Sequence, residues 1–293
     1  MKKEKSKEQT FFQKVKFVAK DIFSPYFSKE ARTFKTKEFE VVQPYPMSMY
    51  ILIVLVIVFI LAIRATNIDL IMFFGNLDNM WRIISRLIDP NFAFLPRMYD
   101  SLIETIQLSV GGTLIGSILA IPAAIFSSSN IVKKSVIYNP VRFIMSLIRT
   151  IPVLVYAAML MFIIGMGAMA GLIALAIFTF TIVAKMLYEV IETVNMQPYE
   201  AIESTGANKL QAIRTAIVPQ VLGSYLSIVL YNFEINIRSA AIIGFVGAGG
   251  IGLLLNDRIS WRQYEDVGMI LLVLFAVIIL IESLSRYLRK KLT

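Results

Sequence analysis

Six polar side chains recur at helical spacing inside an otherwise apolar stretch between residues 220 and 238. They are Gln220, Ser224, Ser227, Tyr231, Glu234 and Arg238, called the polar stripe below. At about 100° per residue they share one helix face, within an arc of roughly 80°. Because an ionised side chain costs about 2.5–3.5 kcal/mol at the centre of a bilayer, this face is expected to meet protein or water rather than lipid.

Two interpretations of the polar stripe remain open. In the first, the stripe lines a translocation pathway, and Arg238 together with Arg149 makes that pathway attractive to anions. In the second, Glu234 and Arg238, which are four residues apart, pair with each other and fix helix packing without touching a solute.

The composition excludes much enzyme chemistry. The chain has no Cys and no His, so it lacks thiolates, the commonest metal ligand and the usual base near neutral pH. It also lacks a Gly-Lys-Ser/Thr phosphate loop, so any ATP and Mg that drive its function are expected on a partner polypeptide. No catalytic residue and no cofactor or metal site is predicted in this chain.

A glycine-rich segment follows the polar stripe. Gly247, Gly249 and Gly252 satisfy the G-x-G-x-x-G pattern, and Gly250 adds a fourth glycine. A dinucleotide-binding fold would require alternating strands and helices, whereas another apolar span of membrane length follows here. We therefore interpret these glycines as sites of close backbone packing or as a non-helical turn at membrane depth, which would suit a gate.

Residues 197–219 form a polar island between two apolar runs. Pro198 suits the first position of a helix, Glu200 then falls at the third, where a carboxylate can meet free amide groups, and Gly206 can end the helix with a positive φ. The spacing predicts a short helix on the membrane surface.

The second half of the island predicts another short helix. Asn208 can cap it, and Leu210, Ile213 and Ile217 share one face. Pro219 then opens a new apolar segment. The island is therefore expected to be ordered and amphipathic.

The composition requires several membrane spans, because 57% of the residues are hydrophobic and the mean hydropathy is +0.70. The predicted fold is an all-α polytopic membrane protein with six spans: residues 49–63, 101–126, 139–164, 168–194, 219–238 and 267–284. Pro152 is expected to break the third span near residues 149–152. The second span carries a small-residue face of Thr105, Gly112 and Gly116 that favours close helix packing. The lower end of the fourth carries a stripe of Thr181, Lys185, Tyr188 and Glu192.

Basic residues set the predicted orientation. Six spans place both termini on the cytoplasmic side of the membrane, together with Lys133, Lys134 and the island. The net charge of +9 is assigned to anionic lipid headgroups, not to nucleic acid. Residues 1–46 form a basic cytoplasmic segment, either an interfacial helix or a disordered tail. Residues 47–100 hold the first span and an extracytoplasmic loop, and residues 101–293 form the main transmembrane domain with the island at 197–219.

The island resembles the ATPase-coupling loop of ABC importer permeases. Glu200, Ala201, Gly206 and Pro219 match that motif in register, whereas Ile202, Ala216 and Val218 depart from it. With PVLVYAAML, VPQVL, LYNFEINIRSA and GFVGAGGIG in the same order, the chain from about residue 104 onwards resembles permeases of the phosphonate-uptake ABC family. Methionine-type permeases have a comparable glycine-rich segment.

The resemblance implies a permease of the type I importer fold, in a bacterial cell membrane, that performs no chemistry itself. It implies a second copy of the permease, two cytoplasmic ATPases that bind ATP and Mg, and an extracytoplasmic solute-binding protein. In this interpretation Glu200, Ala201, Gly206, Asn208, Leu210 and Pro219 form the ATPase-coupling loop, and phosphonate or a related phosphorus oxyanion is the solute. The alternatives are a permease for another solute such as methionine, an ion-coupled carrier working alone, or a membrane-embedded enzyme acting on lipid or isoprenoid phosphates.

Overall fold

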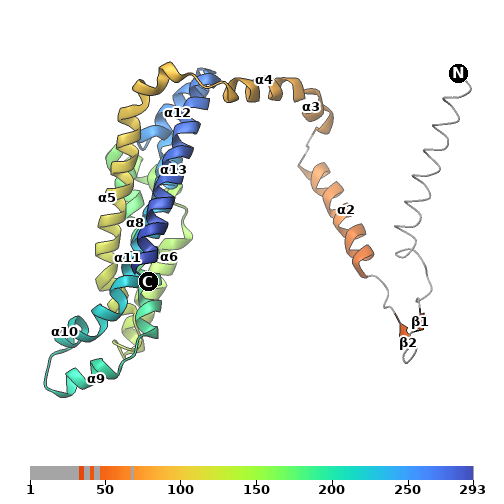
Figure 1. Ribbon diagram of the computed structural model, residues 1–293. Coiled ribbons are helices and arrows are strands. Elements are labelled where there is room, and N and C mark those ends of the chain that lie inside the picture. The colour runs from red at the N-terminus through yellow and green to blue at the C-terminus, as the bar shows by residue number, and fades with distance from the viewer. Residues whose placement is uncertain (1–32, 36–39, 43–46, 67–68, 293) are drawn as a thin grey trace, which may run out of the picture. The chain divides into compact units, whose positions relative to one another are not determined.

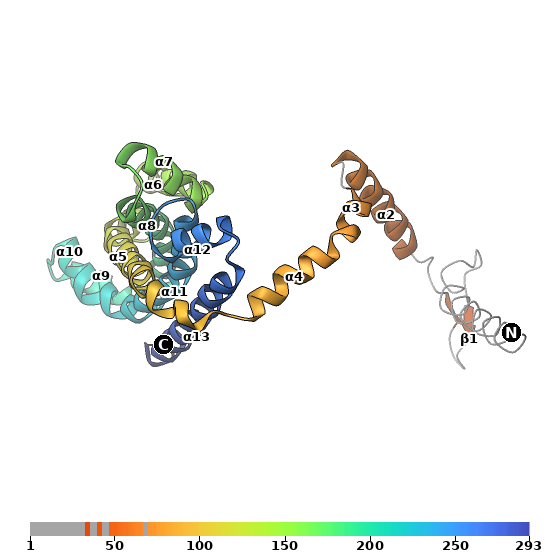
Figure 2. The same cartoon turned by 90° about the horizontal axis from the view of Figure 1, so that it is seen from above.

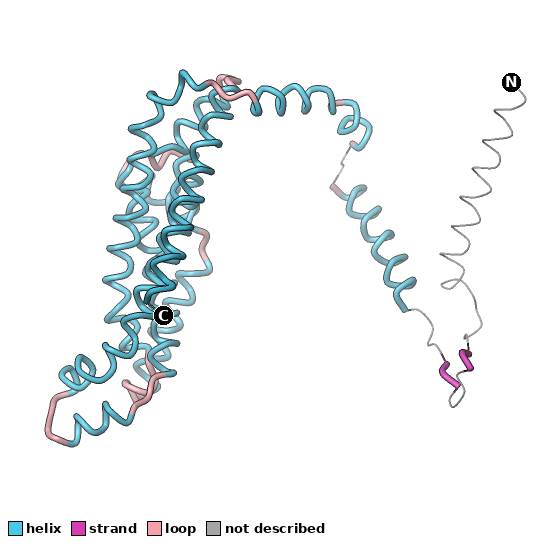
Figure 3. The backbone as a smooth tube through the Cα atoms, viewed as in Figure 1, coloured by secondary structure: helices cyan, strands magenta, loops and turns pink. Residues whose placement is uncertain are grey.

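A computed structural model describes residues 33–35, 40–42, 47–66 and 69–292 of the chain. Helices make up almost all of these residues (Figure 3). The chain divides into two units, residues 1–77 and 78–293. Of the basic segment at residues 1–46, predicted as an interfacial helix or a tail, only residues 33–35 and 40–42 are described; the rest of that prediction lies outside the described residues.

The first unit contains two short strands and two helices. β1 (Thr33–Lys35) pairs antiparallel with β2 (Glu40–Val42), and Phe34 lies opposite Val41. The sequence does not predict these strands. The first predicted span is α2 (Met47–Ala65), which is followed by the short helix α3 (Leu70–Gly75).

The second unit is a helical bundle whose elements follow the predicted spans. Its helices are α4 (Leu77–Ile88, whose first residue falls in the first unit), α5 (Leu95–Ser127), α6 (Ser135–Thr150), α7 (Val153–Ile164), α8 (Ala168–Thr193), α9 (Gln197–Ser204), α10 (Lys209–Ala212), α11 (Val218–Phe245), α12 (Gly250–Ser260) and α13 (Tyr264–Leu292). A short 3₁₀ turn, Phe92–Phe94, precedes α5. α5, α8, α11 and α13 run along the bundle, with α9 and α10 at the end opposite α12 (Figure 1).

Four helices of the described chain are long and apolar enough to cross a membrane, and the count is five if the bent pair α6–α7 is one span. α6 and α7 meet at an angle of 86°. The predicted break at Pro152 is therefore confirmed, since Pro152 lies in the connection and precedes the first residue of α7. The first predicted span corresponds to α2, whose apolar stretch Tyr50–Ala65 is shorter than the four long helices.

Small residues bring α5 and α8 close together. A Cβ atom added to Gly116 would lie 2.5 Å from the carbonyl oxygen of Ala176, and one added to Gly112 would lie 2.6 Å from the Cβ of Leu175. Both distances are too short for any side chain, so glycine is required for this approach. The small-residue face predicted on α5 is confirmed at these two positions.

α11 completes the core against α5 and α8, while α6 and α13 lie on opposite sides of that core (Figure 2). Leu175 and Ile243, from α8 and α11, have no exposed surface and meet in one apolar cluster. The inner face of the bundle is therefore set by three helices, and α6 and α13 add separate outer surfaces.

Candidate functional site: the surface loop, the polar stripe and the glycine turn

Two helices begin in the polar island, as predicted: α9 (Gln197–Ser204) is short, and a second helix starts with α10. Gly206 has φ +90°, a conformation that favours glycine, and its amide donates to the carbonyl of Glu203 at 3.1 Å. Asn208 caps α10: its side chain accepts from the amide of Gln211, and the Gln211 side chain accepts from the amide of Asn208, both at 2.9 Å. Pro198, Gly206 and Asn208 thus place the two helix ends.

The island is anchored to the bundle by a few apolar side chains. Tyr199 of α9 is buried and packs in one cluster with Ile191 of α8 and Ile217. Burial raises the pKa of the Tyr199 hydroxyl. Glu200 and Ala201 are exposed beside it. The island therefore has an anchored face and a free face.

The predicted common face of Leu210, Ile213 and Ile217 is wrong for Leu210. Ile217 is 1% exposed, but Leu210 is 77% exposed. The reason is a π-helical turn at Ile213–Ile217, which adds a residue to one turn and rotates what precedes it. This leaves an apolar side chain in the open on α10.

The same turn changes the expected role of Pro219. The second island helix does not end before Pro219; α10, the π-helical turn and α11 form one helix, Lys209–Phe245. Proline has no amide hydrogen to donate and crowds the preceding turn, and a wider π-helical turn immediately before it accommodates both effects. The island is thus joined to the bundle without a linker.

The polar stripe makes contacts along much of its length. Gln220 donates to the carbonyls of Asn195 at 3.2 Å and Ala216 at 2.7 Å, which ties α11 to the start of the island. Ser224 and Ser227 are half-buried, and the hydroxyl of Ser227 has no hydrogen-bond partner among the described residues. The ring of Tyr231 lies beneath the guanidinium of Arg289, 5.8 Å away.

The charged end of the stripe packs against α13. Glu234, whose side chain is 10% exposed, accepts from Arg238 at 2.5 Å and from Arg289 of α13 at 3.2 Å. Arg238 also lies 4.0 Å from Glu282. The predicted Glu234–Arg238 pair is therefore present, and Arg289 makes it a link between two helices.

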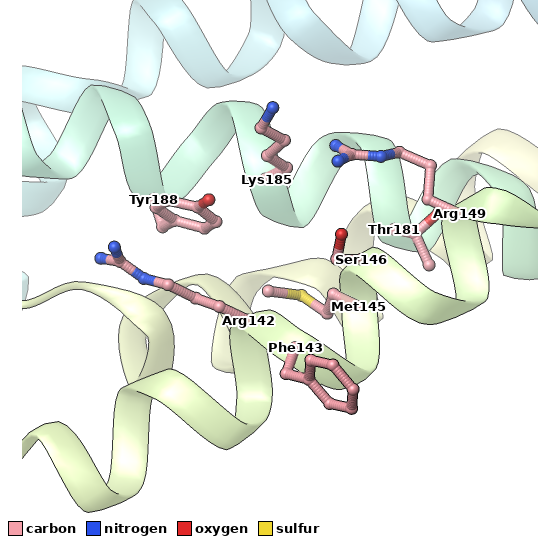
Figure 4. Close-up of a pocket in the computed structure, with 8 residues that line it drawn as sticks. All are labelled: Arg142, Phe143, Met145, Ser146, Arg149, Thr181, Lys185 and Tyr188. Atoms are coloured by element: carbon pink, nitrogen blue, oxygen red, sulfur yellow. The ribbon is translucent and has the colours of Figure 1, made fainter.

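Arg149 lies elsewhere. It lines a pocket of about 350 Å³ between α6 and α8 whose other basic side chains are Arg142 and Lys185 (Figure 4). None of the polar stripe residues lines this pocket. The structure thus does not bring Arg149 and the polar stripe together within one chain.

The glycine-rich segment forms a non-helical turn between α11 and α12. Gly247, Gly249 and Gly250 have φ values of +110°, +85° and +70°, whereas Gly252 lies inside α12. A Cβ on Gly252 would lie 2.0 Å from the carbonyl oxygen of Ala241, so this glycine permits close packing of α12 on α11. Both suggested uses of glycine occur in the segment.

The turn is held by residues that the sequence pattern did not connect to it. Glu104 of α5 accepts from the amide of Gly250 at 3.0 Å, and Thr105 accepts from the amide of Ile251 at 2.7 Å. These are first-turn amides of α12, which have no partner within the helix. The amide of Gly167, which precedes α8, donates to the carbonyl of Gly247 at 3.1 Å. α5 and α8 together therefore fix the turn.

A buried amide joins the three core helices and was also missed. Asn236 of α11 has no exposed surface, and its side-chain nitrogen donates to the hydroxyls of Thr113 of α5 at 2.8 Å and Thr179 of α8 at 2.6 Å. The sequence does contain a signal for this contact: Asn236 lies within an apolar span, and buried polar groups in membranes need hydrogen-bond partners. Among the described residues, no group of three or more acidic residues, His or Cys could hold a metal ion.

Comparison with protein families identifies the chain. Residues 112–293 match the family described as "Binding-protein-dependent transport system inner membrane component", and the chain belongs to that family. It is thus a multi-pass permease of the ABC transporter class.

Several relatives of the chain are named for phosphorus anions. The phosphate-import permease protein PhnE of Mycolicibacterium smegmatis is 33% identical over 72% of this chain and 40% of its own length. The phosphite transport system permease protein PtxC of Stutzerimonas stutzeri is 31% identical over 69% of this chain and 73% of its own. A putative cryptic phosphonate transport system permease protein of Escherichia coli is 40% identical over 41% of this chain and 98% of its own. The chain thus spans less than half the length of the first of these relatives.

Solved structures confirm the fold. A chain of the MetNI methionine ABC transporter in inward-facing conformations superposes with a TM-score of 0.62 at 18% identity, covering 69% of this chain and 99% of that chain. An amino acid ABC transporter gives 0.56 at 22% identity, covering 68% and 95%. The predicted type I importer permease fold is therefore correct.

Proposed function

We propose that this permease imports phosphonate or a related small phosphorus oxyanion, delivered by an extracytoplasmic binding protein and driven by ATP. The observation that carries the proposal is that relatives 31–40% identical are named for phosphate, phosphite and phosphonate transport. The chain itself makes and breaks no bonds in this proposal, and partner ATPases bind ATP and Mg.

The exposed island is the proposed docking site for the ATPase. Leu210 projects from α10 with 77% of its surface exposed, and Ala201 of α9 is small enough to allow close approach of a partner. Both helices are fixed by Gly206 and Asn208. The Leu210 side chain would thus insert into a groove on the ATPase from a helix that is already ordered.

Movement of the island would be passed to the glycine turn at the other end of α11. The two are joined by the uninterrupted helix Lys209–Phe245, and Gly247, Gly249 and Gly250 supply the turn that follows it. Alternating access would follow if ATP-driven closure of two ATPases moved the islands of two permease copies. The island and both termini lie on the cytoplasmic side in this proposal.

Reconstitution in liposomes tests the proposal. The permease, its ATPase and its binding protein are expected to give ATP-dependent uptake of phosphate, phosphite or methylphosphonate. Uptake of only methionine or carnitine would make the solute assignment wrong, and turnover of lipid phosphates by the permease alone would favour an enzyme. A thermal-shift screen of the binding protein against the same solutes gives an independent answer.

Leu210 offers a matched pair of variants for the docking role. Leu210→Asp is expected to abolish both co-isolation with the ATPase and uptake, whereas Leu210→Met keeps the apolar side chain and both properties. Because the side chain is exposed, neither variant should lower the thermal stability of the permease. Full uptake by Leu210→Asp would reject the island as the docking site.

A further inference from the structure

The pocket between α6 and α8 is lined by polar and basic groups that the proposed mechanism does not use. Its lining residues are Arg142, Phe143, Met145, Ser146, Arg149, Thr181, Lys185 and Tyr188. Three of the four residues of the stripe expected at the lower end of α8, Thr181, Lys185 and Tyr188, thus line this pocket. The volume of about 350 Å³ falls within the range of small-molecule sites.

The pocket carries an excess of positive charge. Arg142 pairs with Glu192, and Lys185 lies 3.5 Å from Glu189, whose side chain is 53% exposed. Arg149 makes no ion pair within the described part of the chain. Three cations and two carboxylates leave one positive charge, and that charge belongs to Arg149.

Arg142 is held in place before any ligand arrives. Its Nε donates to the carbonyl of Ser127 at 2.8 Å, and its guanidinium lies 4.5 Å from the ring centre of Tyr188 and 5.0 Å from that of Tyr138. A fixed cation loses little conformational entropy when an anion binds.

The remaining polar groups face the space between the cations. Figure 4 shows the Arg149 side chain extending towards Lys185, while the hydroxyls of Ser146 and Tyr188 point into the same space. No acidic side chain is among the residues that line the pocket, so the polar groups that an anion would meet in this space are cations and hydroxyls only. Guanidinium groups bind tetrahedral phosphorus oxyanions through paired hydrogen bonds, and hydroxyls can donate further ones.

We propose that this pocket binds a small phosphorus oxyanion, with Arg149 and Lys185 as its main charged contacts. The identity of the anion rests on the proposed function, whereas the charge of the ligand follows from the pocket. Arg142 contacts Glu192 near the end of α8, so the pocket lies in the part of the bundle that leads to the island. A free solute leaving the pathway and a phospholipid headgroup both supply this oxyanion chemistry.

Direct binding to the full-length permease tests the pocket without ATP. Radiolabelled inorganic phosphate and methylphosphonate are titrated onto the permease in nanodiscs of phosphatidylcholine. Binding to the wild type should be saturable, and Arg149→Gln should weaken it by about tenfold or more because a charged hydrogen-bond partner is lost. Arg82→Gln is the matched control, since Arg82 is an exposed arginine of α4 that is bonded to Asn79. It should bind like the wild type.

A second variant and a second lipid complete the design. Ser146→Asp places a negative charge in the pocket from an exposed position and should also abolish binding, so the test does not depend on Arg149 alone. If phosphatidylglycerol in the nanodiscs suppresses phosphate binding and is retained by the wild type but not by Arg149→Gln, the site stands and its occupant is the lipid. Equal phosphate binding and equal lipid retention in the wild type and both pocket variants would overturn the proposal.

Uptake assays separate this proposal from the proposed function. Normal phosphorus-anion uptake together with unchanged binding in both variants would reject the pocket and leave the importer assignment intact. The opposite result is also informative. If phosphate binding is saturable and depends on Arg149 but the reconstituted transporter imports no phosphorus anion, the assigned solute is rejected and the proposal for the pocket stands.

Discussion

Glu234 should contribute more to the stability of the permease than any acid on the bundle surface. It is nearly buried and accepts from Arg238 at 2.5 Å and Arg289 at 3.2 Å. A hydrogen bond to a charged partner contributes about 1.5–3 kcal/mol. The hydrogen bond from Arg238 contributes less, about 1 kcal/mol, because 47% of the Arg238 side chain is exposed to solvent. Glu234→Gln should therefore lower the free energy of unfolding by about 2–4 kcal/mol.

Thermal unfolding of the purified permease measures this effect. At about 2–4 °C per kcal/mol for a chain of this size class, the melting temperature should fall by roughly 5–15 °C. Glu189→Gln is the control: Glu189 lies outside this cluster and pairs with Lys185 at 3.5 Å, both side chains are exposed, and such pairs contribute about 1 kcal/mol or less. Equal destabilisation by the two variants would refute the reasoning.

A double-mutant cycle with Arg289→Gln isolates the link between α11 and α13. A coupling energy of about 1–2 kcal/mol is expected for residues in direct contact. Uptake by Arg238→Ala then separates the two interpretations of the polar stripe. If both uptake and assembly remain intact in that variant, a pathway role for Arg238 is excluded and the packing role remains.

Three further variants test other parts of the fold. Asn236→Ala leaves two buried threonine hydroxyls without their donor and should cost about 1–2 kcal/mol in thermal unfolding; no change would mean that this network is not stabilising. Gly206→Ala, at φ +90°, should cost about 1 kcal/mol and lower ATPase stimulation, whereas Gly75→Ala, with open space and no positive φ, should not. Gly116→Ala would place a Cβ atom 2.5 Å from a backbone oxygen and should prevent folding. In the control variant Gly111→Ala, the new Cβ meets only a leucine methyl group, and the protein should fold. Similar yields of folded protein from the two variants would contradict this.

Local signals in the sequence predicted local structure well. Pro198, Gly206 and Asn208 are residues whose backbone chemistry fixes a helix end, and each acts as expected. Pro152 likewise breaks the third span. Periodicity identified the polar stripe because polar residues in a membrane helix are confined to one face.

The sequence could not predict which element each face meets. Glu104 and Gly250 are 146 positions apart, and nothing in their spacing indicates that one carboxylate holds the glycine turn. Arg289 completes the Glu234 site from the last span for the same reason. The error at Leu210 has another cause: a single extra residue in one turn changes the angular position of everything before it.

The unbroken helix from Lys209 to Phe245 gives the permease a lever arm. Its 37 residues correspond to about 55 Å of axial length. A tilt of about 10° about one end would displace the other by roughly 10 Å, a distance comparable to the width of a helix. The π-helical turn at Ile213–Ile217 is the place where this helix can bend most easily. The stiffness of that turn therefore determines how much of a displacement of the surface helices is transmitted to the other end of the helix.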